Sequence, residues 1–194
     1  MSFQKDKQRT LNRKDNSKKG SIDKGIKKLV DIINGCADYC TTSSCSGRIL
    51  LIAPARKKNE TEWLYTSHNE VKFTDIKKEL KKLPKKDVYF KQESFIIHVN
   101  CKDIKAAAKL LEIANRCGCK RAGIITANKN VVVEIISTEH FDTIIAKKGK
   151  LLIEDDFLKI LLNEANSRMK RNREKIKRME KEINAVHFGK IIPA

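Results

Sequence analysis

A long amphipathic stripe near the C-terminus is the feature that most constrains how this chain folds. Its residues alternate spacings of three and four, a heptad-like pattern sustained over more than three heptads. The stripe comprises Leu162, Ala165, Met169, Asn172, Ile176, Met179, Ile183 and Val186. Between Arg168 and Lys181 the remaining surface is basic. The pattern predicts one long helix over about residues 155–186, which either packs on its own domain or pairs with another helix.

The rest of the chain mixes helix and strand patterns. Apolar residues at helical spacing follow Ser21, Thr74 and Asp103, and alternating or continuous apolar runs predict strands. The expected strands cover residues 49–53, 63–67, 88–90, 95–99, 122–126, 131–137 and 141–146. Because strands and helices do not alternate strictly, we expect an α+β fold with a mostly antiparallel sheet, packed helices and a long basic C-terminal helix.

Two segments are predicted to lack regular structure. Residues 1–20 are polar and basic and hold few large apolar side chains, so we expect a flexible basic segment there. Residues 39–48 are rich in serine and threonine and are expected to form a polar loop. The remainder, residues 21–194, is predicted to be a single α+β domain.

The charge balance indicates a polyanionic partner. Lys and Arg total 42 and Asp and Glu total 24, which gives a formal net charge of +18. Each Lys or Arg near a phosphate releases condensed counterions, so nucleic acid is the first candidate and an anionic membrane surface the second. The alternative is a basic surface that serves solubility.

The cysteines and the hydropathy pattern indicate the cellular compartment in which the protein is expected to reside. The six cysteines contain no C-x-x-C pair and no tetrahedral set at ligand spacing, so we expect buried thiols and no metal site. No apolar run reaches the length of a signal peptide or of a membrane span. We therefore expect a cytoplasmic protein with reduced thiols and no membrane partner.

The most distinctive segment is Thr41–Arg48, T-T-S-S-C-S-G-R. Small hydroxyl residues and a glycine make a segment whose backbone N–H groups and side-chain oxygens can surround a ligand closely. The guanidinium of Arg48 suits a carboxylate or a phosphate. By composition alone, however, a serine-rich connector between a helix and a strand is ordinary.

The whole string resembles the signature of the third tRNA wybutosine-synthesis protein family, of archaeal type. Further pieces resemble family motifs in the same order: Ser17–Asp23, Trp63–Tyr65 with Ser67 and His68, Lys91–Val99, Cys117–Ile124, and Ser137, Gly149–Leu151, Ala165 and Asn166 with Asn172. The chain departs from the family pattern at Ser94, where proline is usual, and at Cys119, Ala122 and Ile136.

The resemblance implies an S-adenosylmethionine-dependent methyltransferase. Its expected reaction is N4-methylation of 7-aminocarboxypropyl-demethylwyosine, at the guanosine 3′ of the anticodon in tRNA(Phe). The chain lacks the glycine-rich strand-to-helix fingerprint of common nucleotide sites, and the family is similar in this. The residues expected to bind substrate or cofactor are Asp23, Ser43, Ser44, Cys45, Ser46, Gly47, Arg48, Glu93 and His98. Those expected to contact the tRNA backbone are Lys18, Lys19, Lys170, Arg171, Arg173, Lys177 and Arg178.

Several of these assignments have structural alternatives. His98 follows alternating apolar residues and is also explained as a core histidine, and Asp23 as a residue that complements a helix dipole. Asn172 falls in the C-terminal stripe, where a buried polar residue sets register. Two other functions fit parts of the pattern: a non-catalytic protein that binds RNA or assembles ribonucleoproteins, and an interaction protein that uses a coiled coil.

Overall fold

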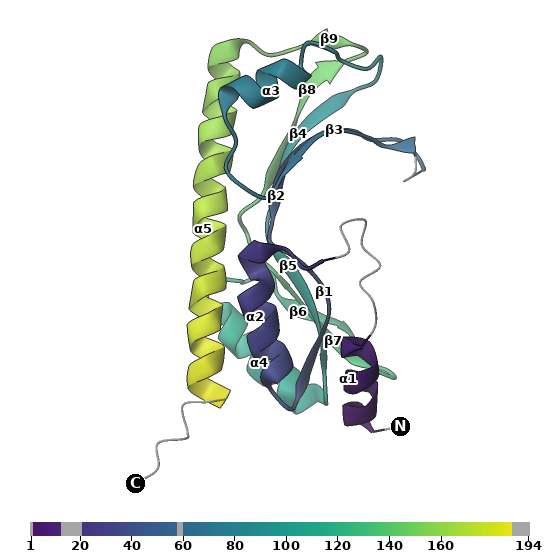
Figure 1. Ribbon diagram of the computed structural model, residues 1–194, viewed down its shortest axis with the longest axis vertical. Coiled ribbons are helices and arrows are strands. Elements are labelled where there is room, and N and C mark those ends of the chain that lie inside the picture. Colours follow the sequence, from purple (N-terminus) through teal and green to yellow (C-terminus); the bar gives the residue numbers. More distant parts are fainter. Residues whose placement is uncertain (1, 13–20, 58–59, 188–194) are drawn as a thin grey trace. The chain divides into compact units, whose positions relative to one another are not determined.

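The structure is a computed structural model that describes residues 2–12, 21–57 and 60–187 (Figure 1). Contacts divide the chain into two compact units. Unit 1 comprises residues 1–46, 95–138 and 173–194, and unit 2 comprises residues 47–94 and 139–172. Each unit holds one sheet in which every strand pair is antiparallel, which confirms the predicted α+β class.

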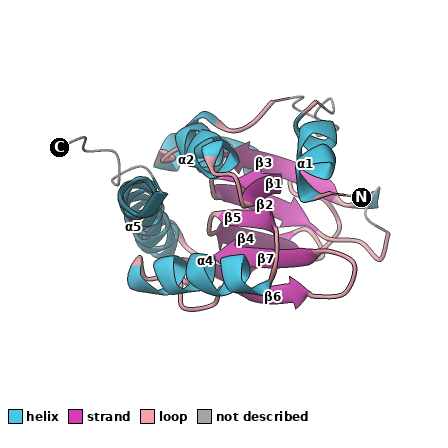
Figure 2. Ribbon diagram, turned by 90° about the horizontal axis from the view of Figure 1, so that it is seen from below, coloured by secondary structure: helices cyan, strands magenta, loops and turns pink. Residues whose placement is uncertain are grey.

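Unit 1 is built on a four-stranded sheet in the order β1-β5-β7-β6. Its strands are β1 (Tyr39–Cys45), β5 (Ile96–Cys101), β6 (Gly123–Thr126) and β7 (Val131–Ile136). Its helices are α1 (Phe3–Leu11), α2 (Lys24–Gly35), α4 (Ile104–Arg116) and the C-terminal part of α5 (Asp155–His187). Helices α2, α4 and α5 cover one face of this sheet (Figure 2).

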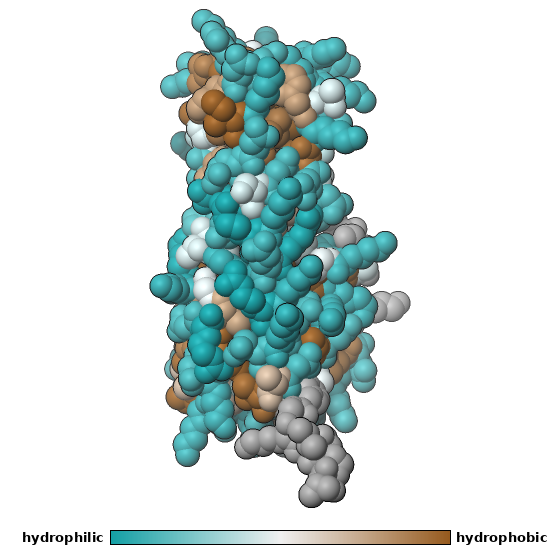
Figure 3. Space-filling model, turned by 90° about the vertical axis from the view of Figure 1, so that its left-hand side faces the viewer, coloured by the Kyte–Doolittle hydropathy of each residue, from teal (hydrophilic) through white to brown (hydrophobic). Residues whose placement is uncertain are grey.

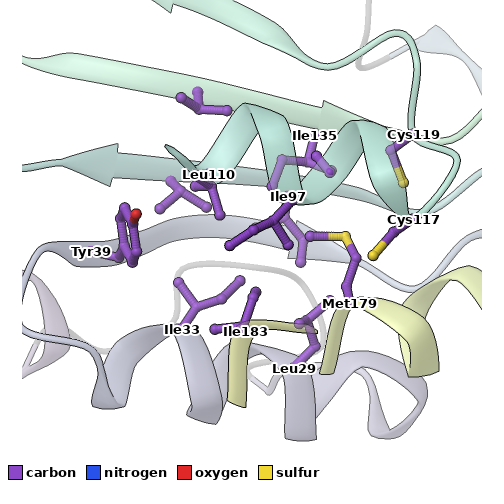
Figure 4. Close-up of a cluster of buried hydrophobic side chains, with 14 of the residues drawn as sticks. Leu29, Ile33, Tyr39, Ile97, Leu110, Cys117, Cys119, Ile135, Met179 and Ile183 are labelled. Atoms are coloured by element: carbon purple, nitrogen blue, oxygen red, sulfur yellow. The ribbon is translucent and has the colours of Figure 1, made fainter. Parts of the chain in front are cut away.

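The core of unit 1 lies between that sheet face and the three helices. Leu29, Leu110, Met179 and Ile97 come from α2, α4, α5 and β5, and their side chains converge (Figure 4). Burying such surface stabilises a fold by about 25 cal/mol for each Å² of apolar area. The predicted cap of α4 is confirmed, since the carboxylate of Asp103 accepts a hydrogen bond of 2.8 Å from the backbone N–H of Ala106.

Unit 2 is built on a five-stranded sheet in the order β3-β2-β4-β8-β9. Its strands are β2 (Arg48–Ala53), β3 (Glu62–Ser67), β4 (Val88–Glu93), β8 (Phe141–Lys147) and β9 (Lys150–Leu151). Its helices are α3 (Phe73–Glu79) and the N-terminal part of α5. One sheet face packs its alternate apolar residues, among them Leu51 and Phe90, against Ile76 of α3 and Leu162 of α5.

The C-terminal stripe packs inside its own chain. Leu162, Ala165 and Met169 belong to the core of unit 2, and Ile176, Met179 and Ile183 belong to the core of unit 1. Asn172 is also fully buried, whereas Val186 is 42% exposed. The side of the molecule that carries α5 is predominantly hydrophilic at its surface (Figure 3). The predicted long helix is therefore confirmed, and its stripe is used within the chain rather than left for a coiled-coil partner.

The loop predicted over residues 39–48 is wrong. Residues 39–45 form β1, which pairs with β5 and carries one register shift between Thr41 and Ser43. A strand can carry polar side chains where it is exposed, as Thr42 and Ser43 are, and the side-chain oxygen of Asn34 accepts a hydrogen bond of 2.8 Å from the backbone N–H of Thr41. Serine content therefore misled the interpretation, because part of this strand is exposed.

A helix occupies part of the segment that was expected to be flexible. Residues 3–11 form α1, whose Lys7 is buried and donates a hydrogen bond of 2.6 Å from Nζ to the carbonyl of Cys36. Gln4 donates a second hydrogen bond, of 2.9 Å, to the carbonyl of Ala37. Polar side chains rather than apolar ones thus hold α1, which is why hydropathy did not predict it.

We expect Asn166 to contribute strongly to the stability of unit 2. Its side-chain amide donates to the carbonyl of buried Val71 and accepts from the N–H of Val71, both at 2.9 Å. Asn166→Ala leaves these two backbone groups unpaired, so we predict a loss of about 1–3 kcal/mol in the free energy of unfolding, measured by urea titration. Asn163→Ala, at an exposed position of the same helix, is the control and should not destabilise. Equal losses for both variants would contradict the prediction.

Candidate functional site

In unit 1, Asp23 is held against the end of the serine-rich segment. Asp23 is the N-cap of α2 and is only 8% exposed. Its carboxylate accepts hydrogen bonds from the backbone N–H of Ser46 at 3.0 Å and from the Ser46 hydroxyl at 3.3 Å. Gly25 allows this approach, because a Cβ there would lie 3.3 Å from the Cβ of Ser46. The carboxylate therefore fixes the end of the T-T-S-S-C-S-G-R segment and makes no side-chain capping hydrogen bond to α2.

A second polar cluster of unit 1 runs across three strands. The Nδ1 atom of His98 lies 2.7 Å from the hydroxyl of Ser43, and its Nε2 atom lies 2.8 Å from a carboxylate oxygen of Glu134. The three residues are register partners on β1, β5 and β7. With Glu134 accepting from Nε2–H, a neutral imidazole accepts from the Ser43 hydroxyl at Nδ1. His98 is thus a half-buried member of a polar row rather than a core histidine.

Sequence reasoning missed Glu134. It is the one charged residue in the β-branched run V-V-V-E-I-I of β7, and a carboxylate in such a run is the signal that could have found it. The neighbours of Ser43 in the predicted site are less exposed: Ser44 and Cys45 are half-buried, and Ser46 is buried.

In unit 2, a histidine side chain forms a hydrogen bond with the turn that precedes β2. Gly47 adopts a φ of 87°, a backbone conformation that favours glycine, and its carbonyl lies 2.8 Å from Nδ1 of His68. His68 belongs to the W-L-Y-T-S-H segment, which resembled a family motif without being assigned a role. Nδ1–H must donate here, because a carbonyl only accepts.

Arg48 lies between a carboxylate and an aromatic ring. Its Nε donates a 2.6 Å hydrogen bond to Glu93, its register partner on β4, and its guanidinium carbon lies 4.9 Å from the ring centroid of Trp63. The structure therefore brings together Arg48 with Glu93, and Ser43 with His98. Glu93 and His98 belong to different units.

The cations predicted to bind tRNA differ in their surroundings. Arg171 donates to Glu139 at 2.8 Å and to Glu164 at 3.3 Å, and Lys170 forms an ion pair with Glu70 at 3.5 Å. Lys177 and Arg178 are exposed, and Arg173 is half-buried. Lys18 and Lys19 lie outside the described residues.

The cysteines are predominantly buried, as expected. Cys45 is half-buried and the other five are buried. Burial raises the pKa of Cys117 to about 11 and the pKa values of Cys101 and Cys119 to about 12. Within the described part of the chain, no helix is long and apolar enough to cross a membrane.

Comparison with known proteins places the chain in a family. Residues 5–185 match the family described as Methyltransferase TYW3. The "tRNA(Phe) 7-((3-amino-3-carboxypropyl)-4-demethylwyosine(37)-N(4))-methyltransferase 1" of Pyrococcus horikoshii is 36% identical over 88% of both chains. The enzyme of the same name, without the final numeral, from Methanocaldococcus jannaschii is 36% identical over 90% of this chain and 93% of its own length. The chain belongs to the TYW3 methyltransferase family.

Solved structures share the fold of this chain. The structure of the PH1069 protein from Pyrococcus horikoshii superposes with a TM-score of 0.86 at 34% identity and covers 95% of both chains. A hypothetical protein from Aeropyrum pernix gives a TM-score of 0.74 at 26% identity, over 84% of this chain and 98% of that one. The fold described here is therefore the fold of solved relatives.

The thiols offer a direct check on the burial pattern. Because a raised pKa leaves less thiolate at a given pH, we predict that Cys101, Cys117 and Cys119 react much more slowly with iodoacetamide at pH 8 than Cys45 does. Peptide mapping by mass spectrometry gives the rate at each site, and labelling in denaturant is the control. Alkylation of Cys119 as fast as that of Cys45 in the folded protein would contradict the burial pattern.

Proposed function

We propose that this chain transfers a methyl group from S-adenosylmethionine to N4 of 7-aminocarboxypropyl-demethylwyosine, at the guanosine 3′ of the anticodon in tRNA(Phe), in the cytoplasm. The observation that carries the proposal is the similarity, over about nine tenths of the chain, to curated methyltransferases whose names state this substrate. The net charge of +18 suits a polyanionic substrate, and the six free cysteines suit a reducing compartment.

The described residues fit the chemistry of these ligands. Within residues 2–12, 21–57 and 60–187, Arg48 donates its hydrogen bond through Nε, which leaves the two terminal nitrogens of its guanidinium for a second carboxylate. Both the methionine part of the cofactor and the aminocarboxypropyl arm of the substrate present a carboxylate. A guanidinium fork matches two carboxylate oxygens and stays charged at any working pH. Arg48 would therefore hold one of these two carboxylates.

In unit 1, the polar residues Ser43 and His98 would orient a bound base. When bound, S-adenosylmethionine supplies a methyl group on a sulfonium, which an unprotonated ring nitrogen can attack. Such a step depends chiefly on holding the reacting atoms in line. Ser43 and His98, whose hydrogen bonds fix each other, present polar groups on the open face of the sheet in unit 1. Asp23 holds Ser46 and so fixes the segment that carries Ser43.

A conservative change at Arg48 tests the proposed carboxylate clamp. Arg48→Lys keeps the charge and loses the fork, so we predict a loss of at least about tenfold in kcat/KM for methyl transfer to precursor tRNA(Phe), or about 1.4 kcal/mol, with little change in melting temperature. Arg56→Lys, at an exposed position of the same unit, is the matched control. A lowered melting temperature with an intact transfer rate would show that Arg48 is structural and would refute the clamp.

The helix cations are proposed to bind the tRNA backbone unequally. Since Arg171 already binds two carboxylates while Lys177 and Arg178 are exposed, the double variant Lys177→Ala/Arg178→Ala should reduce the salt dependence of tRNA affinity, and Arg171→Ala should not. Removing one cation that neutralises a duplex phosphate lowers the slope of log K against log salt by about 0.9. Filter binding over a range of KCl concentrations measures the slope. An unchanged slope in the double variant places the tRNA elsewhere.

A further inference from the structure

The sheet face of unit 2 that faces away from α3 and α5 carries a row of aromatic and aliphatic side chains. Strand register places Trp63 of β3 opposite Ile52 of β2, Ile52 opposite Tyr89 of β4, and Tyr89 opposite Ile144 of β8. Trp63 is 44% exposed, and Ile52, Tyr89 and Ile144 are half-buried. A large aromatic side chain exposed beside other apolar side chains lowers solubility, and exposed apolar patches of this kind often mark binding surfaces.

Two cations lie beside this aromatic row. The guanidinium carbon of Arg48 lies 4.9 Å from the ring centroid of Trp63, and Nζ of Lys91 lies 5.8 Å from the ring centroid of Tyr89. Arg48 is held in turn by Glu93, and Lys91 forms an ion pair with Asp142 at 3.2 Å. These interactions fix both cations and restrict the indole before any ligand arrives, which lowers the entropy cost of binding.

We infer that Trp63 stacks an unpaired base of the tRNA anticodon loop, with Tyr89 as a second stacking surface and Arg48 and Lys91 beside it. This inference rests on the proposed function and adds to it the surface that would bind the RNA strand. Single-stranded RNA is commonly bound by aromatic side chains on an open sheet face, with cations nearby for the backbone. Adenine of the cofactor is the competing planar ligand, and the fluorescence experiment below distinguishes it from an RNA base.

The single tryptophan of the chain makes the inference directly measurable. A synthetic hairpin with the anticodon-loop sequence of tRNA(Phe) should quench the fluorescence of Trp63 saturably, because a stacked base touches the indole. Trp63→Leu should weaken binding of this hairpin at least about fivefold, the low end for loss of base–aromatic stacking. Trp63→Phe keeps an aromatic face and should restore most of the affinity. The salt slope should stay unchanged in both variants, because neither change removes a cation.

Controls separate stacking from misfolding and from charge. Phe157→Leu removes an aromatic that is 46% exposed on α5 and should leave hairpin affinity unchanged, and melting curves verify folding of all variants. Absence of quenching by the hairpin, or quenching by S-adenosylmethionine alone at saturating concentration, would overturn the inference. In either case methyl transfer by the wild-type protein would still stand. If instead the wild-type protein transfers no methyl group while the hairpin quenches Trp63, the proposed function fails and the stacking surface stands.

Discussion

Antiparallel strand register is the constraint on which the polar features of this protein depend. Register places Ser43 beside His98 and His98 beside Glu134 in unit 1, and Arg48 beside Glu93 in unit 2. These residues are separated by tens of positions in the chain, so no local motif brings them together. A slip of one residue in any of these pairings would turn the polar side chains to the helix-covered face and leave apolar ones exposed. The buried alternate residues of the same strands, such as Ile97 and Leu51, oppose such a slip.

The long C-terminal helix supplies apolar side chains to both cores. Residues of its first half pack against the sheet of unit 2, and residues of its second half pack against the sheet of unit 1. The heptad-like spacing keeps the stripe buried from Leu162 to Ile183, while the polar remainder carries the exposed cations Lys177 and Arg178. One element thus serves both stability and, in the proposed function, tRNA binding.

Local patterns in the sequence were sufficient for much of the fold. Alternating or continuous apolar runs predicted the strands other than β1 and β9, the cap at Asp103 predicted α4, and the spacing from Leu162 onward predicted α5. What failed depends on distant partners. Strand β1 carries the hydroxyl side chains of Thr41–Ser44 and is positioned by its pairing with β5, and α1 is held by a hydrogen bond from Lys7 to the carbonyl of Cys36. The strands predicted over residues 88–90 and 95–99 are present as β4 and β5, but the sequence did not indicate that they belong to different sheets.

The site residues also divide into those that local motifs predicted and those that depend on distant strand partners. Arg48, Ser43 and Asp23 were found because they lie within motifs that resemble a family signature, whereas Glu134 lies in no such motif and was identified through its bond to His98. The partners of Arg48 could not be assigned from sequence either, because Glu93 and Trp63 reach it through pairing with two different strands. Periodicity gives the face on which a residue lies, but only register gives its neighbours.

The most direct test of the central claim is the mass of the modified nucleoside in tRNA(Phe) before and after reaction. Purified protein is incubated with methyl-deuterated S-adenosylmethionine and tRNA(Phe) that carries 7-aminocarboxypropyl-demethylwyosine, and the digested nucleosides are analysed by mass spectrometry. We predict that one labelled methyl group appears on the tricyclic base and that tRNA lacking the precursor remains unlabelled. Tight tRNA binding without any label on that base would contradict the account and would indicate a protein that binds RNA without catalysing methyl transfer.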